Sequence, residues 1–165
     1  MRSALARGLA LSVGCASGAD ALVLSSALAV SPASVSLFCV GSSTGAGFWS
    51  GSASLSLLRS AAPAGAAVSW WAGGVSSLPL RARLIRRSKS ALSGCSCAVF
   101  FLASASSHGS LAVAARAARA GLPVFAFSLG FSGPPSALPA LSGLGGWSFF
   151  SLGVWAWQPA QAVLF

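Results

Sequence analysis

Acidic side chains are almost absent from this chain of 165 residues. Asp20 is the only Asp or Glu, whereas Lys and Arg number ten, so the formal net charge is +9. General acid–base hydrolysis needs a positioned acid or base with an oriented partner, and only Asp20 and His108 are available for that work. We therefore predict no catalytic residues and a chain that is not an enzyme.

Charge of either sign is scarce, and so are side chains that bind metals. Charged residues make up 7% of the chain and hydrophobic residues 55%, where a soluble domain carries about 25% charged residues. No C-x-x-C pair occurs, and there is one histidine, so we expect no zinc site and no cofactor. Buried free thiols, which fit a reducing cytoplasm, are expected at Cys15, Cys39, Cys95 and Cys97.

Long unbroken apolar segments are missing too. Residues 21–40 are numerous enough to span a bilayer, but five serines and Pro32 interrupt them. Residues 97–103 and 122–127 are apolar runs the length of one buried strand. The pattern favours a covered sheet over membrane helices. A small membrane-associated protein with a basic cytosolic segment at Arg81–Lys89 is the first alternative.

Short strands and helices alternate along the chain, separated by Gly, Ser and Pro. Strands are expected at 9–13, 35–40, 67–72, 95–103 and 123–127, and helices at 19–28, 54–62, 80–92 and 110–120. Such alternation is typical of right-handed βαβ units. We predict a three-layer α/β domain over residues 1–130 with one Rossmann-like parallel sheet. A Gly/Pro-rich tail, 131–165, follows with a last strand near 147–152.

Two glycine-containing turns each join the end of an expected strand to the start of a helix. They are Gly14–Asp20 and Ser107–Ser110. Such a turn points free N–H groups and the positive end of a helix at one spot, which suits phosphate. At the carboxyl ends of parallel strands, the two turns would line one ligand crevice. The alternatives are an ordinary strand–helix turn capped by Asp20, and a loop hydrogen-bonding role for His108.

Half of the cations lie within nine residues, at Arg81, Arg83, Arg86, Arg87 and Lys89. Arginine contacts phosphate in bidentate fashion, and a basic excess attracts polyanions such as nucleic acid. A solvated helix face is the competing interpretation. The six tryptophans are candidate stacking surfaces for bases, although apolar packing explains most of them.

The order of these motifs resembles the DNA-processing protein A (DprA/Smf) family, within a broader Rossmann-like superfamily of nucleotide and DNA-ligand domains (SLOG, lysine decarboxylase-like). The resemblance rests on Gly14–Asp20, Arg86–Ser93, Cys97–Leu102, His108–Leu111 and Gly121–Ala126. It implies a recombination mediator that binds single-stranded DNA or a nucleotide-derived ligand. By similarity, with the neighbouring Ser88 and Lys89 added, the phosphate-facing residues are Gly14, Ser17, Gly18, Asp20, Arg86, Arg87, Ser88, Lys89, Gly109 and Ser110.

The chain departs from that family at several positions. The family's first strand and its glycine turn have no counterpart before Arg2, so we expect a truncated sheet. Ser88 stands where Asn is usual, and Val113 stands where related nucleotide hydrolases carry glutamate. A degraded hydrolase relative without activity is the second alternative. The leading prediction is a cytoplasmic binding module, with self-association left open and a membrane less expected than nucleic acid.

Overall fold

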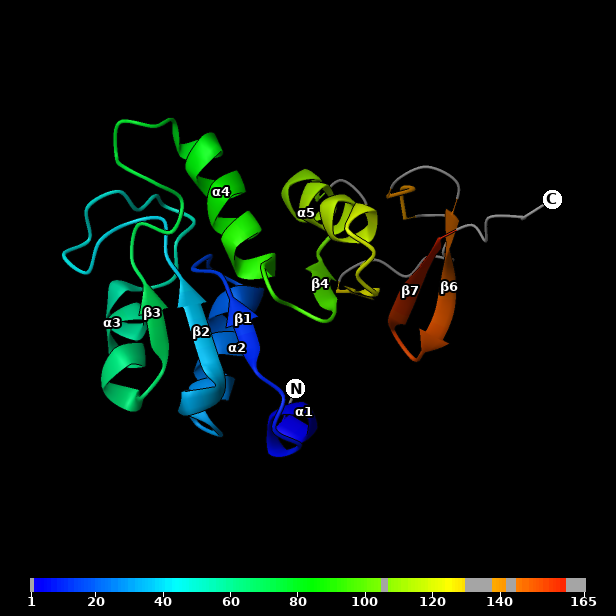
Figure 1. Cartoon of the computed structure of the whole chain (residues 1–165), viewed down its shortest axis with the longest axis horizontal. Helices are drawn as coiled ribbons and strands as arrows, with labels where there is room; N and C mark the ends of the chain where they lie inside the picture. The colour runs from blue at the N-terminus through cyan, green and yellow to red at the C-terminus, as the bar shows by residue number, and fades with distance from the viewer. Residues whose placement is uncertain (1, 105–106, 130–137, 142–144, 160–165) are drawn as a thin grey trace. The chain divides into compact units, whose positions relative to one another are not determined.

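The computed structural model describes residues 2–104, 107–129, 138–141 and 145–159. Its contacts divide the chain into two compact units, which we call the N-terminal unit, Met1–Ser93, and the C-terminal unit, Gly94–Phe165 (Figure 1). The domain boundary expected near residue 130 lies within 130–137, outside the described residues. Each unit contains its own sheet.

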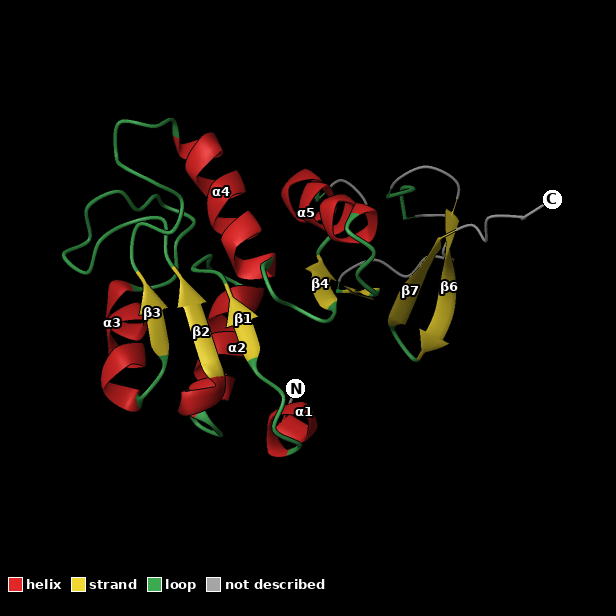
Figure 2. Cartoon of the chain, viewed as in Figure 1, coloured by secondary structure: helices red, strands yellow, loops and turns green. Residues whose placement is uncertain are grey.

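The N-terminal unit is built on a three-stranded parallel sheet in the order β1-β2-β3. Its strands are β1 (Leu11–Val13), β2 (Val35–Phe38) and β3 (Ala67–Ser69). Its helices are α1 (Arg2–Ala6), α2 (Ala19–Leu28), α3 (Leu55–Ala64) and α4 (Leu80–Leu92), with a 3-10 turn at Pro32–Ser34. Helices α2 and α3 are the β1–β2 and β2–β3 crossovers (Figure 2).

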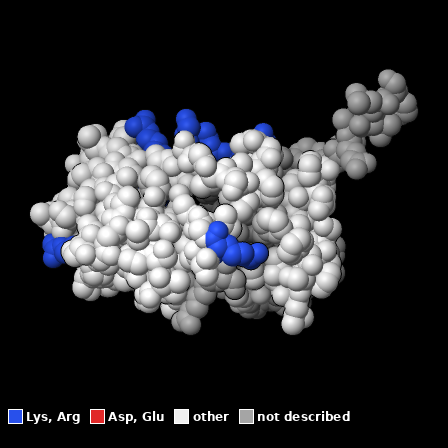
Figure 3. Space-filling view, turned by 60° about the horizontal axis from the view of Figure 1, so that its bottom comes forward, with Lys and Arg blue, Asp and Glu red and all other residues white. Residues whose placement is uncertain are grey.

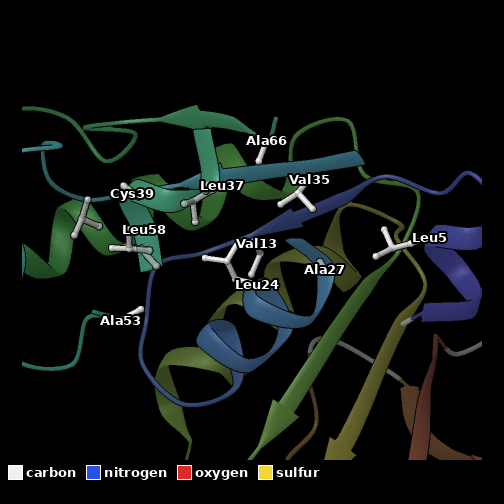
Figure 4. Packing of buried hydrophobic residues seen from close by; sticks show 13 residues of the cluster. Leu5, Val13, Leu24, Ala27, Val35, Leu37, Cys39, Ala53, Leu58 and Ala66 are labelled. Atoms are coloured by element: carbon white, nitrogen blue, oxygen red, sulfur yellow. The ribbon is translucent and has the colours of Figure 1, made fainter. Parts of the chain in front are cut away.

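Alternate strand residues supply the core of this unit. Val13 pairs with Leu37 in the parallel register, and both are buried on one face of the sheet together with Val35. Leu24 of α2 and Leu58 of α3 are fully buried in the same cluster (Figure 4). Burial of these side chains supplies the main driving force for this fold. The Ser54 side chain caps α3 by accepting a hydrogen bond from the Leu57 amide at 3.4 Å.

The C-terminal unit contains a four-stranded mixed sheet in the order β4-β5-β7-β6. Its elements are β4 (Ala98–Leu102), α5 (His108–Arg119), β5 (Val124–Ser128), β6 (Gly145–Ser151) and β7 (Val154–Pro159). Strands β4 and β5 are parallel, and α5 is their crossover. Strands β6 and β7 form an antiparallel hairpin in which Trp147 and Trp157 make an edge-to-face contact at 5.5 Å.

The mixed α/β fold with parallel strands is confirmed, but the single parallel sheet is wrong. The strands belong to two sheets, and the second is mixed because the hairpin adds two antiparallel strands. The last strand expected near 147–152 is present as β6, whereas β7 was not predicted. Within the described residues, no helix has the length and apolar character needed to cross a bilayer.

Candidate nucleic-acid interface

The turn Gly14–Asp20 connects β1 to α2, as the sequence predicted. Gly18 occupies the N-cap position of α2 with a φ of +74°, a conformation that favours glycine. The Ala16 amide donates to Asp20 Oδ2 at 3.2 Å, and the Ser17 amide donates to the Gly51 carbonyl at 2.8 Å. Two N–H groups that a phosphate would need therefore already have acceptors within the protein.

Asp20 and Arg87 form an ion pair beneath this turn. Arg87 Nη1 lies 3.5 Å from Asp20 Oδ2, and the two side chains are 11% and 36% exposed. Gly14 lies against the pair, because a Cβ at that position would collide with Arg87 Nη1 and approach Asp20 Oδ2 to 2.6 Å. The Asp20 carboxylate thus supplies the negative charge at the start of α2, where a bound anion would otherwise sit.

Arg83 is also directed into the protein. It is 8% exposed, and its Nη1 donates to the Val40 carbonyl at 3.0 Å and the Gly47 carbonyl at 2.7 Å. Its Nε donates to the Leu78 carbonyl at 3.2 Å. Arg83 and Arg87 are four residues apart and so share one face of α4. This face holds α4 against the loops around the sheet. The sequence interpretation required Arg87 to face a ligand from solvent, whereas the structure places it inside the protein.

The outward face of α4 carries the other cations of the cluster. Arg81, Arg86 and Lys89 are exposed, whereas Ser88 is half-buried. Arg86 and Lys89 line an open depression of about 750 Å³, opposite the loop Trp71–Gly74. Figure 3 shows Lys and Arg as separate groups on a face that displays no acidic side chain. Two of the predicted site residues, Arg86 and Lys89, thus lie at this depression.

Two glycines in the loop Trp71–Gly74 allow the backbone of this loop and that of α4 to approach each other closely. A Cβ on Gly73 would collide with the backbone of Arg83, and Gly74 has a φ of +96°. Ser90 Oγ donates to the Ala72 carbonyl at 3.4 Å, which holds the loop to the helix. The loop Trp71–Gly74 thus lines the depression together with the cationic side chains of α4. Sequence reasoning missed this loop, although Trp-Trp-Ala-Gly-Gly before a basic helix was a usable signal.

The second predicted turn lies in the C-terminal unit. Ser107 is the N-cap residue of α5, so His108, Gly109 and Ser110 form the first helical turn rather than a loop. The Ser104 amide donates to Ser107 Oγ at 3.3 Å. Because the turns Gly14–Asp20 and Ser107–Ser110 follow strands of different sheets, they do not flank a crevice of one common sheet.

The cysteines differ in their environments. All four are free; Cys15 and Cys39 are buried, Cys95 is half-buried and Cys97 is exposed, so the expectation of four buried thiols is wrong for two of them. No cluster of three or more His, Cys, Asp or Glu that could hold a metal ion occurs within the described ranges. Among the tryptophans, Trp71 lines the depression and Trp157 is buried.

Comparison with known proteins adds no assignment. The chain matches no protein-family model, no curated protein and no solved structure. The resemblance to the DNA-processing protein A family therefore stays a prediction. The candidate interface rests on Arg86, Lys89 and the loop Trp71–Gly74 alone.

Proposed function

We propose that the N-terminal unit binds single-stranded DNA along the outward face of α4. The observation that supports this proposal is the open depression between Arg86, Lys89 and the loop Trp71–Gly74. Its volume of about 750 Å³ is large enough for a nucleotide, since ligand sites commonly measure about 300–1,000 Å³. Its open form suits a chain that continues beyond one nucleotide.

The chemistry of the depression matches a phosphate backbone with attached bases. Arg86 can form paired hydrogen bonds with phosphate oxygens, and Lys89 adds a point charge three residues along the same helix. Trp71 offers an apolar ring surface to a base. The sole acid, Asp20, is paired with Arg87, so no unpaired acidic side chain opposes the approach of phosphate.

The strand order of the N-terminal unit supports the Rossmann-like part of the proposal. The succession β1-α2-β2-α3-β3 with parallel strands is the layout of one mononucleotide-binding half of such folds. The role as a recombination mediator, which comes from the resemblance, and a reducing cytoplasmic location, which suits free cysteines, belong to the same proposal.

A pair of double variants tests the binding site. Arg86→Ala with Lys89→Ala removes two cations from the depression, and Arg116→Ala with Arg119→Ala removes two exposed cations at the same spacing on α5. Affinity for a fluorescein-labelled oligothymidylate is measured by anisotropy over a range of salt concentrations. With three phosphate contacts along this face of α4, at Arg81, Arg86 and Lys89, we expect a log–log salt slope of about −2, because each contact to a single strand contributes about −0.7.

The first double variant should reduce the slope to about −0.7, whereas the α5 variant should leave it unchanged. An equal loss of affinity in the two double variants would show non-specific attraction by net charge and contradict the proposed site. Absence of binding by the unmodified chain would do the same. Thymidine monophosphate is tested as a competitor at the same phosphate concentration as unlabelled oligothymidylate. Equal competition would indicate a single-nucleotide ligand, and weaker competition by the monophosphate would indicate a polymer.

A further inference from the structure

Cys15 and Cys39 lie side by side at the carboxyl ends of two neighbouring strands. Val13 is the register partner of Leu37, and each cysteine follows two residues later. Both residues are fully buried, and each thiol is close enough to the other to shift its pKa. Adjacent strands are about 4.8 Å apart, within the range of Cα separations, about 4.4–6.8 Å, that a disulfide can bridge.

The backbone holds both positions in place. The Ala53 amide donates to the Cys15 carbonyl at 2.9 Å, the Cys39 amide donates to the Ser69 carbonyl at 2.9 Å, and the Ala72 amide donates to the Cys39 carbonyl at 2.8 Å. The main chain at both cysteines is therefore fixed at the ends of the two strands. Their proximity does not depend on a mobile loop coming into position.

The surroundings make the two thiols chemically unequal. The Cys39 hydrogen bond, the nearby Arg87 guanidinium and the Val40 amide together lower the pKa of Cys15 to about 7, against the opposing effects of burial and of Asp20. The same hydrogen bond, together with burial and the neighbouring Cys15 charge, raises the pKa of Cys39. Cys15 thus loses its proton at a lower pH than Cys39, which suits Cys15 to the role of attacking cysteine and Cys39 to that of resolving cysteine.

We propose that Cys15 and Cys39 form a hydroperoxide-reactive site that closes to a reversible disulfide. The Cys15 thiolate attacks one oxygen of hydrogen peroxide, the O–O bond breaks, and the leaving hydroxide combines with the proton that the Cys15 thiol released, which gives the first water. The Cys15 sulfenic acid is then attacked by the Cys39 sulfur, and the S–O bond breaks to release water. Overall, two thiols and one peroxide give one disulfide and two waters.

The burial of the pair restricts the oxidant. Neither cysteine has measurable exposure, and Cys15 itself lies within the Gly14–Asp20 turn. Hydrogen peroxide is uncharged and close to water in size, so it fits this setting better than a bulky disulfide such as oxidised glutathione. The proposal does not depend on nucleic-acid binding.

One peptide reports the reaction in the intact chain. Trypsin cleaves after Arg7 and Arg59 and at no position between them, so a single peptide carries both Cys15 and Cys39. A variant with Cys95→Ser and Cys97→Ser removes the other thiols. After treatment with peroxide, catalase removes the remaining oxidant. The protein is then unfolded, labelled with N-ethylmaleimide and digested, and the mass of the peptide is measured by mass spectrometry.

We expect the peptide to lose two hydrogens and to take up no label, and dithiothreitol treatment before labelling should restore two labels. Adding Cys39→Ser should leave a Cys15 sulfenic acid that dimedone traps. In the unmodified pair, the rate of label loss should reach half its plateau near pH 7, whereas in the Cys39→Ser variant the loss of the Cys39 thiol should move the midpoint of adduct formation to higher pH. The charged groups facing Cys15 are Arg87 and Asp20.

The peptide measurement keeps both Cys15 and Cys39, so a folding defect caused by substituting either cysteine cannot obscure the result. Two labels on the peptide, after a peroxide dose that oxidises Cys97 in the unmodified chain, would overturn the proposal. A disulfide that forms only in denaturant would overturn it too, because the folded register would then not be the cause. A dimedone adduct on Cys15 without disulfide formation in the intact pair would also contradict it.

Discussion

At Gly14 the main chain passes directly beside the guanidinium of Arg87, and this contact leaves no room for a side chain. A methyl group there would collide with Arg87 Nη1 and push it from Asp20. We predict that Gly14→Ala lowers the free energy of unfolding by about 1–3 kcal/mol, as overpacking of a filled site does. Urea unfolding followed by circular dichroism measures the change.

Gly109→Ala is the matched control for that substitution. Gly109 lies in the first turn of α5, and a Cβ there would have no heavy atom within 4 Å. Alanine is the better helix former by about 1 kcal/mol, so stability should stay constant or rise. If both substitutions destabilise equally, the close approach of Arg87 to Gly14 is not the cause.

Asp20 neutralises a guanidinium that is almost completely buried. Removing the carboxylate leaves Arg87 with an unpaired charge, and its Nε already has no hydrogen-bond partner within the described residues. We predict that Asp20→Ala costs about 2 kcal/mol of unfolding free energy. Adding Arg87→Met should recover most of the loss in thermal and urea unfolding. A double variant no more stable than Asp20→Ala would contradict this account.

At the scale of the element, α4 has two basic faces with different roles. Its inward Arg83 donates hydrogen bonds to carbonyls at Val40, Gly47 and Leu78. We predict that Arg83→Met lowers stability by on the order of 2–3 kcal/mol and speeds amide hydrogen exchange in residues 41–47 and 71–78. Arg81→Met, an exposed position on the same helix, should change neither; equal exchange in the two variants would exclude the tethering role.

The elements themselves were largely predictable, and their pairing was not. Helices 19–28 and 80–92 were predicted with the observed bounds, because Gly18 and the Leu80–Leu92 pattern mark them locally. Strand β7 was missed because it lies within the Gly/Pro-rich tail and is defined mainly by its pairing with β5 and β6. Which strands share a sheet is a non-local property, so the division into two sheets lay beyond local patterns.

The candidate site was predictable in part for a similar reason. Clustering of cations pointed to α4 as the basic element, but a count of charges does not say which side of the helix each one occupies. The four-residue spacing of Arg83 and Arg87, with Leu80 and Leu84 beside them, was a signal for an inward face. The turn 14–20 was located correctly, but the internal acceptors of its amides are tertiary contacts.

At the scale of the whole molecule, the two units differ in charge as well as in sheet type. The N-terminal unit has eight of the ten cations and the only acid, whereas Arg116 and Arg119 are the only Lys or Arg in the C-terminal unit. A fragment of residues 1–93 contains a complete core cluster. We predict that this fragment unfolds cooperatively and binds oligothymidylate with the salt slope of the full chain.

Thermal circular dichroism and anisotropy check the two halves of that prediction separately. A folded fragment without affinity for the oligonucleotide would place the binding surface outside the N-terminal unit. A fragment that shows no cooperative transition would mean that the core cluster needs the C-terminal unit for its stability.

The pairing of Asp20 with Arg87 also determines how copies of this molecule behave toward one another in solution. With its only carboxylate side chain committed internally, the protein has no negative side chain left to meet the cations of a neighbouring copy. Like particles of one sign repel within about 10 Å of separation at 0.1 M salt. The isoelectric point of about 11.7 preserves that repulsion across the physiological pH range. Ionic contacts between side chains are thus reserved for molecules of another kind, and colloidal stability should fall when a polyanion is added in charge-equivalent amounts.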